Sequence, residues 1–317
     1  MLKIAVVLFA YVWFSLSVTQ APTPLPEPTR VFTCEQPDRD YYPTDIAFGP
    51  DGTLYSSDAQ LPLRSSLYSK PDLDLPADYL AYGLVYTHRE ADCVAVFGRD
   101  EKVDVFGLSE HEGSVCVAWR IDQNPTLFEQ NEDLLARVSC ITQDGRAELI
   151  YTSESPAAML GDLDSSGESL WLSFRPMNFT MRVGTLGFVV NVTEDQTIPI
   201  ESIPVHFLAA GGERISSLFP LPENDAFYTA ASLLIDNTPI TLDTVFPSGV
   251  LKLQDHILVG DYRTGYLHLL NKKGKPLALF TGLAGPMGMA LSPEGEICIA
   301  EMLGDRVSCY DTETLLE

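Results

Sequence analysis

A repeated hairpin pattern is the feature of this sequence that most limits how the chain can fold. Each copy has a short apolar run, a tight turn and a second run rich in Val, Ile, Leu, Tyr, Phe and Trp, as in paired strands. The clearest copies are Asp45–Asp58 and Met287–Glu301, and a third spans Leu160–Phe174. The six expected turns lie at Gly52, Gly113, Gly167, Asn224, Asp255 and Gly295. All but Asp255 are Gly or Asn, which accept a positive φ at low cost.

The spacing of these turns predicts a closed ring of blades. Successive turns are 61, 54, 57, 31 and 40 residues apart, and hairpins repeated at about 40–50 residues are typical of β-propellers. We therefore predict an all-β fold, a six-bladed β-propeller that forms a single domain over residues 30–317. A pair of β-sandwiches is the alternative. The 31-residue step indicates a reduced fifth blade or a different register there.

The two ends of the predicted domain suggest how the ring closes. After Gly295 the sequence has room for two more strands, Glu296–Ala300 and Arg306–Tyr310. The segment Arg30–Cys34 has strand composition but precedes the first repeat. We expect this N-terminal strand to complete the last blade and so remove a free sheet edge.

The first residues have the layout of a secretory signal peptide. Lys3 precedes the apolar run Ile4–Leu16, and small and polar residues follow over Ser17–Ala21. The run is shorter than the roughly 18–20 apolar residues of a membrane span, so we expect cleavage, with a retained signal anchor as the alternative. Residues 1–21 are the expected signal peptide and 22–29 a proline-rich, extended lead-in. We expect a secreted, extracellular chain with no transmembrane span after cleavage.

Six cysteines fit such an oxidising compartment, because an even number in a secreted chain favours disulfides. The register of the expected hairpins places two pairs of cysteines opposite each other and leaves one pair over. The resulting bonds are Cys34–Cys93, Cys116–Cys140 and Cys298–Cys309. A bond between Cys34 and Cys309 across the closing blade is the alternative. Two sequons, at Asn178 and Asn191, predict N-glycosylation if the chain is secreted.

The charge of the chain argues against one class of partner. Asp and Glu number 44 against 20 Lys and Arg, a formal net charge of −24, and nucleic-acid binding depends on clustered positive charge. We expect no basic cluster to interrupt this excess, and hence no nucleic-acid partner and no affinity for an anionic membrane. The chain is expected to be a monomer.

Two stretches carry a family resemblance. Pro43–Asp58 and Pro286–Glu301 share the pattern Pro-x-x-hydrophobic-Ala-hydrophobic-x-Pro-acidic-Gly, followed by a strand that ends in an acidic residue. This pattern resembles the blades of NHL-repeat propellers. It also resembles the six-bladed group that contains senescence marker protein, gluconolactonase and luciferin-regenerating enzyme. The resemblance implies the architecture better than an activity, because one fold hosts many functions.

The enzymes of that group, with their paraoxonase relatives, imply a divalent cation in the central channel. Its ligands would be carboxylate and amide oxygens near the starts of the innermost strands. The equivalent positions here are Thr44, Asp104, Met159, Ile215, Gly249 and Met287, of which only Asp104 has a carboxylate; a shift by one residue adds Asp45 and Asp162. Asp45, Asp104 and Asp162 are therefore the candidate metal ligands. His256 is the candidate catalytic base.

Two main hypotheses about function follow. The first is a binding module that recognises an extracellular protein, peptide or glycan through its loops, without a cofactor and without enzymatic activity. The second is a calcium-dependent lactonase or esterase, and a structural matrix component is a third. The segment Ser65–Leu84 is expected to be a long excursion of the first blade, where binding tends to be located. The sequence contains no nucleophile elbow, zinc-protease, P-loop or dinucleotide motif.

Overall fold

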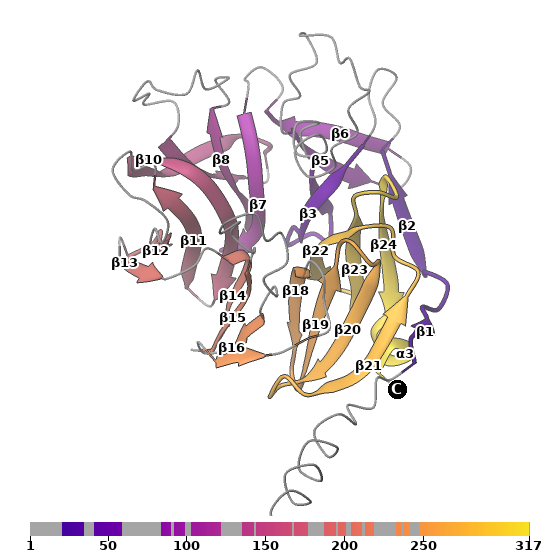
Figure 1. Cartoon of the computed structure of the whole chain (residues 1–317). Coiled ribbons are helices and arrows are strands. Elements are labelled where there is room, and N and C mark those ends of the chain that lie inside the picture. The colour runs from indigo at the N-terminus through magenta and orange to yellow at the C-terminus, as the bar shows by residue number, and fades with distance from the viewer. Residues whose placement is uncertain are drawn as a thin grey trace, which may run out of the picture.

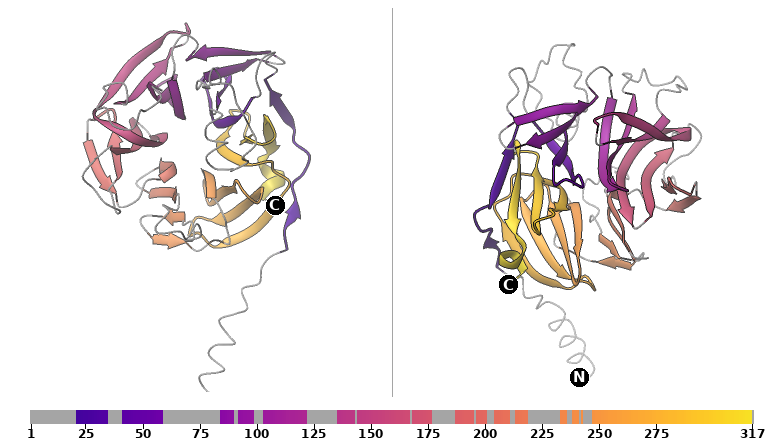
Figure 2. Two further views of the ribbon diagram at one scale, coloured as in Figure 1. Left: turned by 45° about the horizontal axis from the view of Figure 1, so that its top comes forward. Right: turned by 180° about the vertical axis from the view of Figure 1, so that it is seen from behind.

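The protein is a ring of β-sheets around a common centre in the computed structural model (Figures 1 and 2). The structure describes residues 21–34, 41–58, 84–89, 92–98, 103–121, 135–142, 144–166, 168–176, 187–194, 196–200, 204–210, 213–218, 233–235, 238–240, 242 and 247–316. Almost all of their regular structure is β-strand, so the predicted all-β propeller is confirmed. Within these ranges there is no helix with the length and apolar character of a membrane span.

Five sheets follow one another along the chain. The first contains β3 (Pro43–Phe48), β4 (Leu54–Asp58), β5 (Leu84–Arg89) and β6 (Asp92–Phe97). The second contains β7 (Val103–His111), β8 (Ser114–Ile121), β9 (Leu135–Ile141), β10 (Ala147–Ser166), β11 (Ser169–Pro176), β12 (Gly187–Asn191) and β13 (Gln196–Ile200). The third contains β14 (Pro204–Ala210), β15 (Glu213–Leu218), β16 (Leu233–Ile235) and β17 (Thr238–Ile240).

The last two sheets include N-terminal strands. The fourth contains β18 (Pro247–Leu253), β19 (His256–Asp261), β20 (Tyr266–Asn271), β21 (Pro276–Thr281) and, at its edge, β1 (Thr23–Pro24). The fifth contains β22 (Pro286–Leu291), β23 (Glu296–Glu301), β24 (Arg306–Asp311) and β2 (Arg30–Thr33). The short helix α3 (Thr312–Leu316) follows β24.

The described sheets number five where the sequence predicts six blades, because β10 belongs to two sets of strands. It pairs with β9 from Ala147 to Pro156 and with β11 from Ala157 to Ser166. The innermost strands are β3, β7, β10, β14, β18 and β22. They contact one another in that order, and β22 contacts β3 again. The ring is therefore closed.

The N-terminal strand closes the ring as predicted. β2 pairs antiparallel with β24, from Arg30 opposite Cys309 to Thr33 opposite Arg306, and Figure 2 shows this indigo strand beside the yellow C-terminal strands. The proline-rich lead-in before β2, expected to be extended only, also contributes a strand. Thr23 and Pro24 form β1, which pairs parallel with Phe280 and Thr281 of β21.

The three disulfides are the predicted ones. Cys116 faces Cys140 and Cys298 faces Cys309 in the strand registers, and both pairs are bonded. Cys34 is bonded to Cys93 of β6. The alternative bond between Cys34 and Cys309 is therefore wrong.

The predicted turns are confirmed where the sequence signal is strongest. Gly52, Gly113 and Gly295 turn their hairpins with φ values of +80°, +78° and +84°. The expected turn at Asn224 lies outside the described residues, between β15 and β16, which pair with each other. The hairpin that contains the innermost strand of the third sheet is a different one, in which Ala210 lies opposite Glu213.

The core is divided among the spaces between neighbouring sheets. Ile46 and Leu54 of the first sheet pack against Ala300 and Val307 of the last, and other apolar clusters lie within or between the following sheets. The described clusters thus join the first sheet to the second, the fourth to the fifth and the fifth to the first, as the repeat requires.

Candidate functional site

The innermost strands approach each other closely just after the first residues of β3, β7, β18 and β22 and in the second half of β10. The pairing of each with its second strand is irregular there, between Pro43 and Asp45, Val105 and Gly107, Leu160 and Leu163, Ser248 and Val250, and Pro286 and Met289. Such irregularities redirect the backbone and its side chains. At them lie Asp45, Gly107, Asp162, Gly249 and Gly288, which we call the inner collar.

The glycines of the inner collar are sites of close backbone approach. A Cβ atom on Gly107 would lie 2.5 Å from the backbone nitrogen of Leu163, and one on Gly288 would overlap Asp45. A Cβ atom on Gly249 would overlap the carbonyl oxygen of Met287. Each glycine therefore accepts the backbone of a neighbouring innermost strand, a role that glycine in a strand often has.

Asp45 joins three innermost strands. Its Oδ1 accepts a hydrogen bond from the backbone N–H of Ile46 at 2.9 Å, and its Oδ2 accepts one from Leu108 of β7 at 2.7 Å. The residue packs on Gly288 of β22. Asp162 of β10 repeats the local part of this arrangement, because its Oδ1 accepts the N–H of Leu163 at 2.8 Å.

The environment of Asp45 changes its acidity. Burial raises the pKa of Asp45 to about 7; the amide hydrogen bonds from Leu108 and Ile46 oppose this rise, and the nearby charge of Asp164 adds to it. A carboxyl group with this pKa is half-protonated near neutral pH, which suits an acid or base. The same value also describes a buried structural carboxyl group that is costly to ionise.

Replacement of Asp45 by asparagine is expected to flatten the pH dependence of stability. The folded chain holds the Asp45 proton more tightly than the unfolded chain does, so this group favours folding most below about pH 4 and less as the pH rises through 7. Between pH 5 and pH 8 the free energy of unfolding of the wild type should fall by roughly 2 kcal/mol more than that of Asp45→Asn. Urea unfolding of both proteins at several pH values measures this, and parallel pH curves would contradict it.

The candidate metal ligands do not converge. Asp104 lies at the start of β7, where its Oδ2 accepts a 2.8 Å hydrogen bond from Nε of Arg120 in an ion pair. Asp45 and Asp162 share the inner collar but are separated by β7, and both bind backbone amides. Thr44 and Met287 each precede a residue of the inner collar by one position. Ile215 was expected on an innermost strand, and this is wrong, because it lies on the second strand β15. Met159 is on β10.

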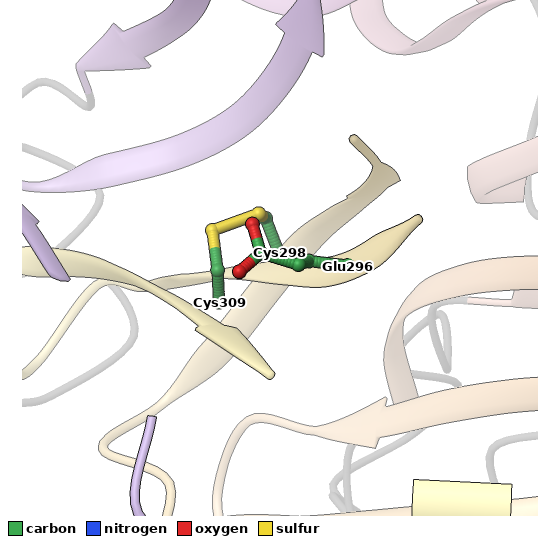
Figure 3. A group of neighbouring side chains, drawn as sticks. All are labelled: Glu296, Cys298 and Cys309. Carbon is green, nitrogen blue, oxygen red and sulfur yellow. A yellow bond between two sulfur atoms is a disulfide. The ribbon is translucent and has the colours of Figure 1, made fainter. Parts of the chain in front are cut away.

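A different group of potential ligands does come together. In the described part of the chain, the one cluster of three such side chains is Glu296, Cys298 and Cys309 (Figure 3). The two sulfur atoms are bonded to each other, and Glu296 pairs with Arg30 and accepts a hydrogen bond from Thr29. This cluster secures the closing strand. With its two sulfur atoms bonded to each other, this cluster does not itself supply the several converging oxygens that a hard cation requires.

His256 lies away from the inner collar. It begins β19, pairs with Leu253 and Asn271, and adjoins the turn between β18 and β19. The structure does not bring it near Asp45 or Asp162, which lie at the other ends of their blades.

Three further buried acids end second strands. Asp58 accepts the backbone N–H of Tyr42 at 2.9 Å, and Asp261 accepts that of Arg263 at 3.0 Å. Glu301 accepts Nε of Arg306 at 2.9 Å and the N–H of Ala284 at 2.7 Å. In these three sheets the acidic residue that ends the second strand therefore fixes the connections beside it.

The two sequons differ in what the structure describes. Asn191 is 1% exposed; its Oδ1 accepts hydrogen bonds from the N–H and hydroxyl of Thr193, and its amide nitrogen donates to Ser169. A glycan at Asn191 would require this turn to open. Asn178 lies outside the described residues.

Sequence reasoning missed part of this arrangement. It considered Gly249 only as a position for a ligand and did not identify Gly107 or Gly288 as contact points. The available signal was glycine inside a strand pattern, which marks close approach of another backbone. Asp164 was also missed, although it follows Asp162 at the two-residue spacing that places side chains on one face of a strand.

Comparison with known proteins supports the fold. No family model matches the sequence, and no curated protein matches it. A gluconolactonase from Xanthomonas campestris has 9% identity and a TM-score of 0.58, over 92% of this chain and 97% of that one. A protein from Thermus thermophilus described as a putative oxidoreductase (glucose dehydrogenase) has 12% identity and a TM-score of 0.57, over 88% and 99%.

A third similar structure is virginiamycin B lyase from Staphylococcus aureus. It has 11% identity and a TM-score of 0.51, over 88% of this chain and 98% of that one. At such identities the likeness concerns the fold alone. The chain is thus a β-propeller similar to those of gluconolactonase and virginiamycin B lyase, as the repeat pattern predicts.

Proposed function

We propose that the chain is a secreted, disulfide-stabilised binding module that recognises an extracellular protein, peptide or glycan through the connections on one face of its ring. The observation that carries this proposal is the difference in length among equivalent connections. The direction of the strands decides on which face those connections lie.

The innermost strands β3, β7, β18 and β22 start on the same face. They meet at the inner collar, which lies near the start of each of them and, on β10, in the half that leads to its hairpin with β11, so these strands run side by side in one direction. Each hairpin then returns the second strand to this face, where Asp58, Asp261 and Glu301 lie. We call it the strand-start face, and the opposite one, with the turns of Gly52 and Gly295, the hairpin face.

The connections that leave second strands on the strand-start face fall into two classes. Asp261 is opposite Tyr266 and Glu301 is opposite Arg306, so residues 262–265 and 302–305 form short turns. Asp58 is opposite Leu84 in the equivalent pairing, and residues 59–83 intervene. The other long connections are 122–134, 177–186 and 219–232. Long insertions on a rigid scaffold are typical of binding sites.

The composition of the long connections also supports binding. They contain Tyr68, Tyr79, Tyr82, Phe128, Phe179, Phe219, Phe227 and Tyr228. Aromatic residues are enriched in the centres of interfaces. The predicted excursion Ser65–Leu84 falls mainly within 59–83, and up to Gly83 it lies outside the described residues.

A hydrolase is the alternative, and the similarity of the fold to that of gluconolactonase fits it as well as it fits a binding module. Among the candidate ligands, Asp45 and Asp162 accept backbone amides and Asp104 pairs with Arg120. A cation-dependent mechanism would require further oxygens to converge with them.

Grafting the short connection 262–265 between Asp58 and Leu84 tests the proposal. The two sites have the same strand pairing, so the variant should fold with an unchanged far-ultraviolet circular dichroism spectrum. Its ligand is first identified on glycan and extracellular-protein arrays. The variant should bind that ligand at least roughly tenfold more weakly than the wild type does. A matched graft replaces 122–134 between Ile121 and Leu135.

The outcomes separate the two functions. Loss of binding in either folded graft supports the module. Full binding by both grafts would refute recognition through these connections. Hydrolysis of lactones or aryl esters by the wild type, with stabilisation by calcium, would favour the enzyme instead.

A further inference from the structure

The turn between β20 and β21 carries a concentration of positive charge. Lys272, Lys273 and Lys275 lie in it, and Lys252 is on β18 in the same sheet. These are four of the seven lysines in a sequence whose formal net charge is −24. The expectation that no basic cluster interrupts the acidic excess is therefore wrong. We call Lys272, Lys273 and Lys275, with the backbone that carries them, the basic turn.

The backbone of the basic turn is held in one conformation. The Oδ1 atom of Asn271 accepts the N–H groups of Lys273 at 2.9 Å and Lys275 at 3.0 Å. The N–H of Asn271 donates to the carbonyl of Lys275, and that of Gly274 to the carbonyl of Asn271. Gly274 supplies the positive φ, +77°, that the turn needs. The lysines are thus presented by a preorganised hairpin, which lowers the entropic cost of binding.

Two of the lysine side chains are available to a partner. Lys272 forms an exposed ion pair with Asp255 at 2.8 Å. Lys273 and Lys275 are exposed, and no carboxylate of the described residues forms an ion pair with either. An exposed lysine without an acidic neighbour keeps its full charge for a ligand.

The surroundings make this charge distinctive. The basic turn lies on the hairpin face, where β20 and β21 meet in the lower part of Figure 1. Turns of the first, second and fifth sheets on this face carry acids, namely Asp51, Glu112, Glu168, Glu194 and Glu294, and Arg146 in the β9–β10 turn pairs with Asp144. At physiological ionic strength charges are screened beyond about 8 Å, so a ligand at this turn responds mainly to the lysines.

We propose that the basic turn binds a linear sulfated glycan. The ligand must be anionic, because the turn offers exposed ammonium groups. It must also be recognised by charge alone, because the N–H groups of all five residues 271–275 are already bonded within the protein. A peptide strand would need free backbone partners. A chain of regularly spaced sulfates needs only point charges, which lysine provides.

This surface is separate from the proposed loop site. The basic turn lies on the hairpin face, and the long connections leave from the strand-start face. A propeller held to a sulfated glycan through the fourth sheet would keep its long connections directed away from that glycan. The protein could then present its loop ligand at a glycan-rich surface.

A charge-matched pair of variants tests the proposal. Lys273→Gln/Lys275→Gln removes two charges from the basic turn, and Arg146→Gln/Arg263→Gln removes two exposed charges elsewhere. A heparin octasaccharide is titrated into each full-length secreted protein at roughly physiological salt, with a desulfated octasaccharide as the ligand control. The lysine variant should bind roughly tenfold more weakly than wild type, and the arginine variant within about twofold. Both variants should melt like wild type, since all four side chains are exposed.

Other results would overturn the proposal. These are equal affinities of the two variants, binding of the desulfated octasaccharide as strong as that of the sulfated one, or no wild-type binding at millimolar heparin octasaccharide. Tighter binding to polyglutamate or to phosphatidylserine vesicles, lost in the lysine variant, would assign the turn to another anionic partner. Self-association that the lysine variant abolishes would assign it to a second copy of this acidic chain.

Discussion

Replacement of Gly249 by alanine is expected to destabilise the ring by roughly 3 kcal/mol or more. Gly249 has a φ of +50°, in the left-handed region, and its added Cβ would overlap the carbonyl oxygen of Met287 in the neighbouring innermost strand. The clash is with backbone, so rotation of a side chain cannot relieve it. β18 and β22 would have to separate. Urea unfolding followed by circular dichroism measures the loss.

Gly113→Ala is the matched control for this variant. Gly113 has a φ of +78°, but nothing lies within 4 Å of its added Cβ. This substitution incurs the backbone cost without the clash, roughly 1 kcal/mol. Equal losses in the two variants would show that close packing at the inner collar adds nothing to stability.

The inner collar explains how the ring can be closed. The backbone of one strand packs on Gly107, Gly249 and Gly288 of the neighbouring strands, and Asp45 and Asp162 bind amides at the same level. Two of the three acids that the family resemblance suggests as metal ligands therefore also hold backbone in place. Variation is left to the connections outside it, which is where we place recognition.

Local signals made much of the fold predictable. The Pro-acidic-Gly turns at Gly52 and Gly295 define hairpins without reference to any distant residue, because glycine accepts the required φ. The register of the next hairpin, which turns around Leu303 and Gly304, gives the pairing of Cys298 with Cys309. The position of β2 could be predicted because a closed ring leaves a single free edge for a single remaining strand.

Features that depend on contacts between distant segments could not be predicted in this way. β1 consists of Thr23 and Pro24 paired with β21, and no pattern in two residues indicates such a partner. The sequence around Asn224 does not indicate that it follows the second strand of the third sheet, because the hairpin of the innermost strand lies earlier, where Ala210 is opposite Glu213. Asp45 and Asp104 lie apart because of the way three strands pack. The spacing of residues along the sequence carries no information about that packing.

The second large effect concerns the N-terminal segment, which ties three sheets together. β1 adds to the fourth sheet and β2 to the fifth, and Cys34 is bonded to Cys93 in the first. Thr29 donates its N–H to the carbonyl of Cys309 at 2.8 Å, and Arg30 pairs with Glu294 and Glu296. The disulfide is the covalent part of this closure.

Cys34→Ser/Cys93→Ser is therefore expected to lose about 4 kcal/mol of unfolding free energy, because a cross-link over 59 residues removes much entropy from the unfolded chain. Cys116→Ser/Cys140→Ser opens a loop of 24 residues between neighbouring strands of one sheet, and the same relation gives about 3 kcal/mol. Guanidinium unfolding of oxidised proteins measures both. A loss below about 1 kcal/mol for the first variant would mean that the pairing of β2 with β24 closes the ring unaided. The bond between Cys34 and Cys93 joins the last blade to the first. A larger loss of unfolding free energy than in the second variant, together with faster proteolysis before residue 34, would therefore show that the ring begins to unfold at this junction.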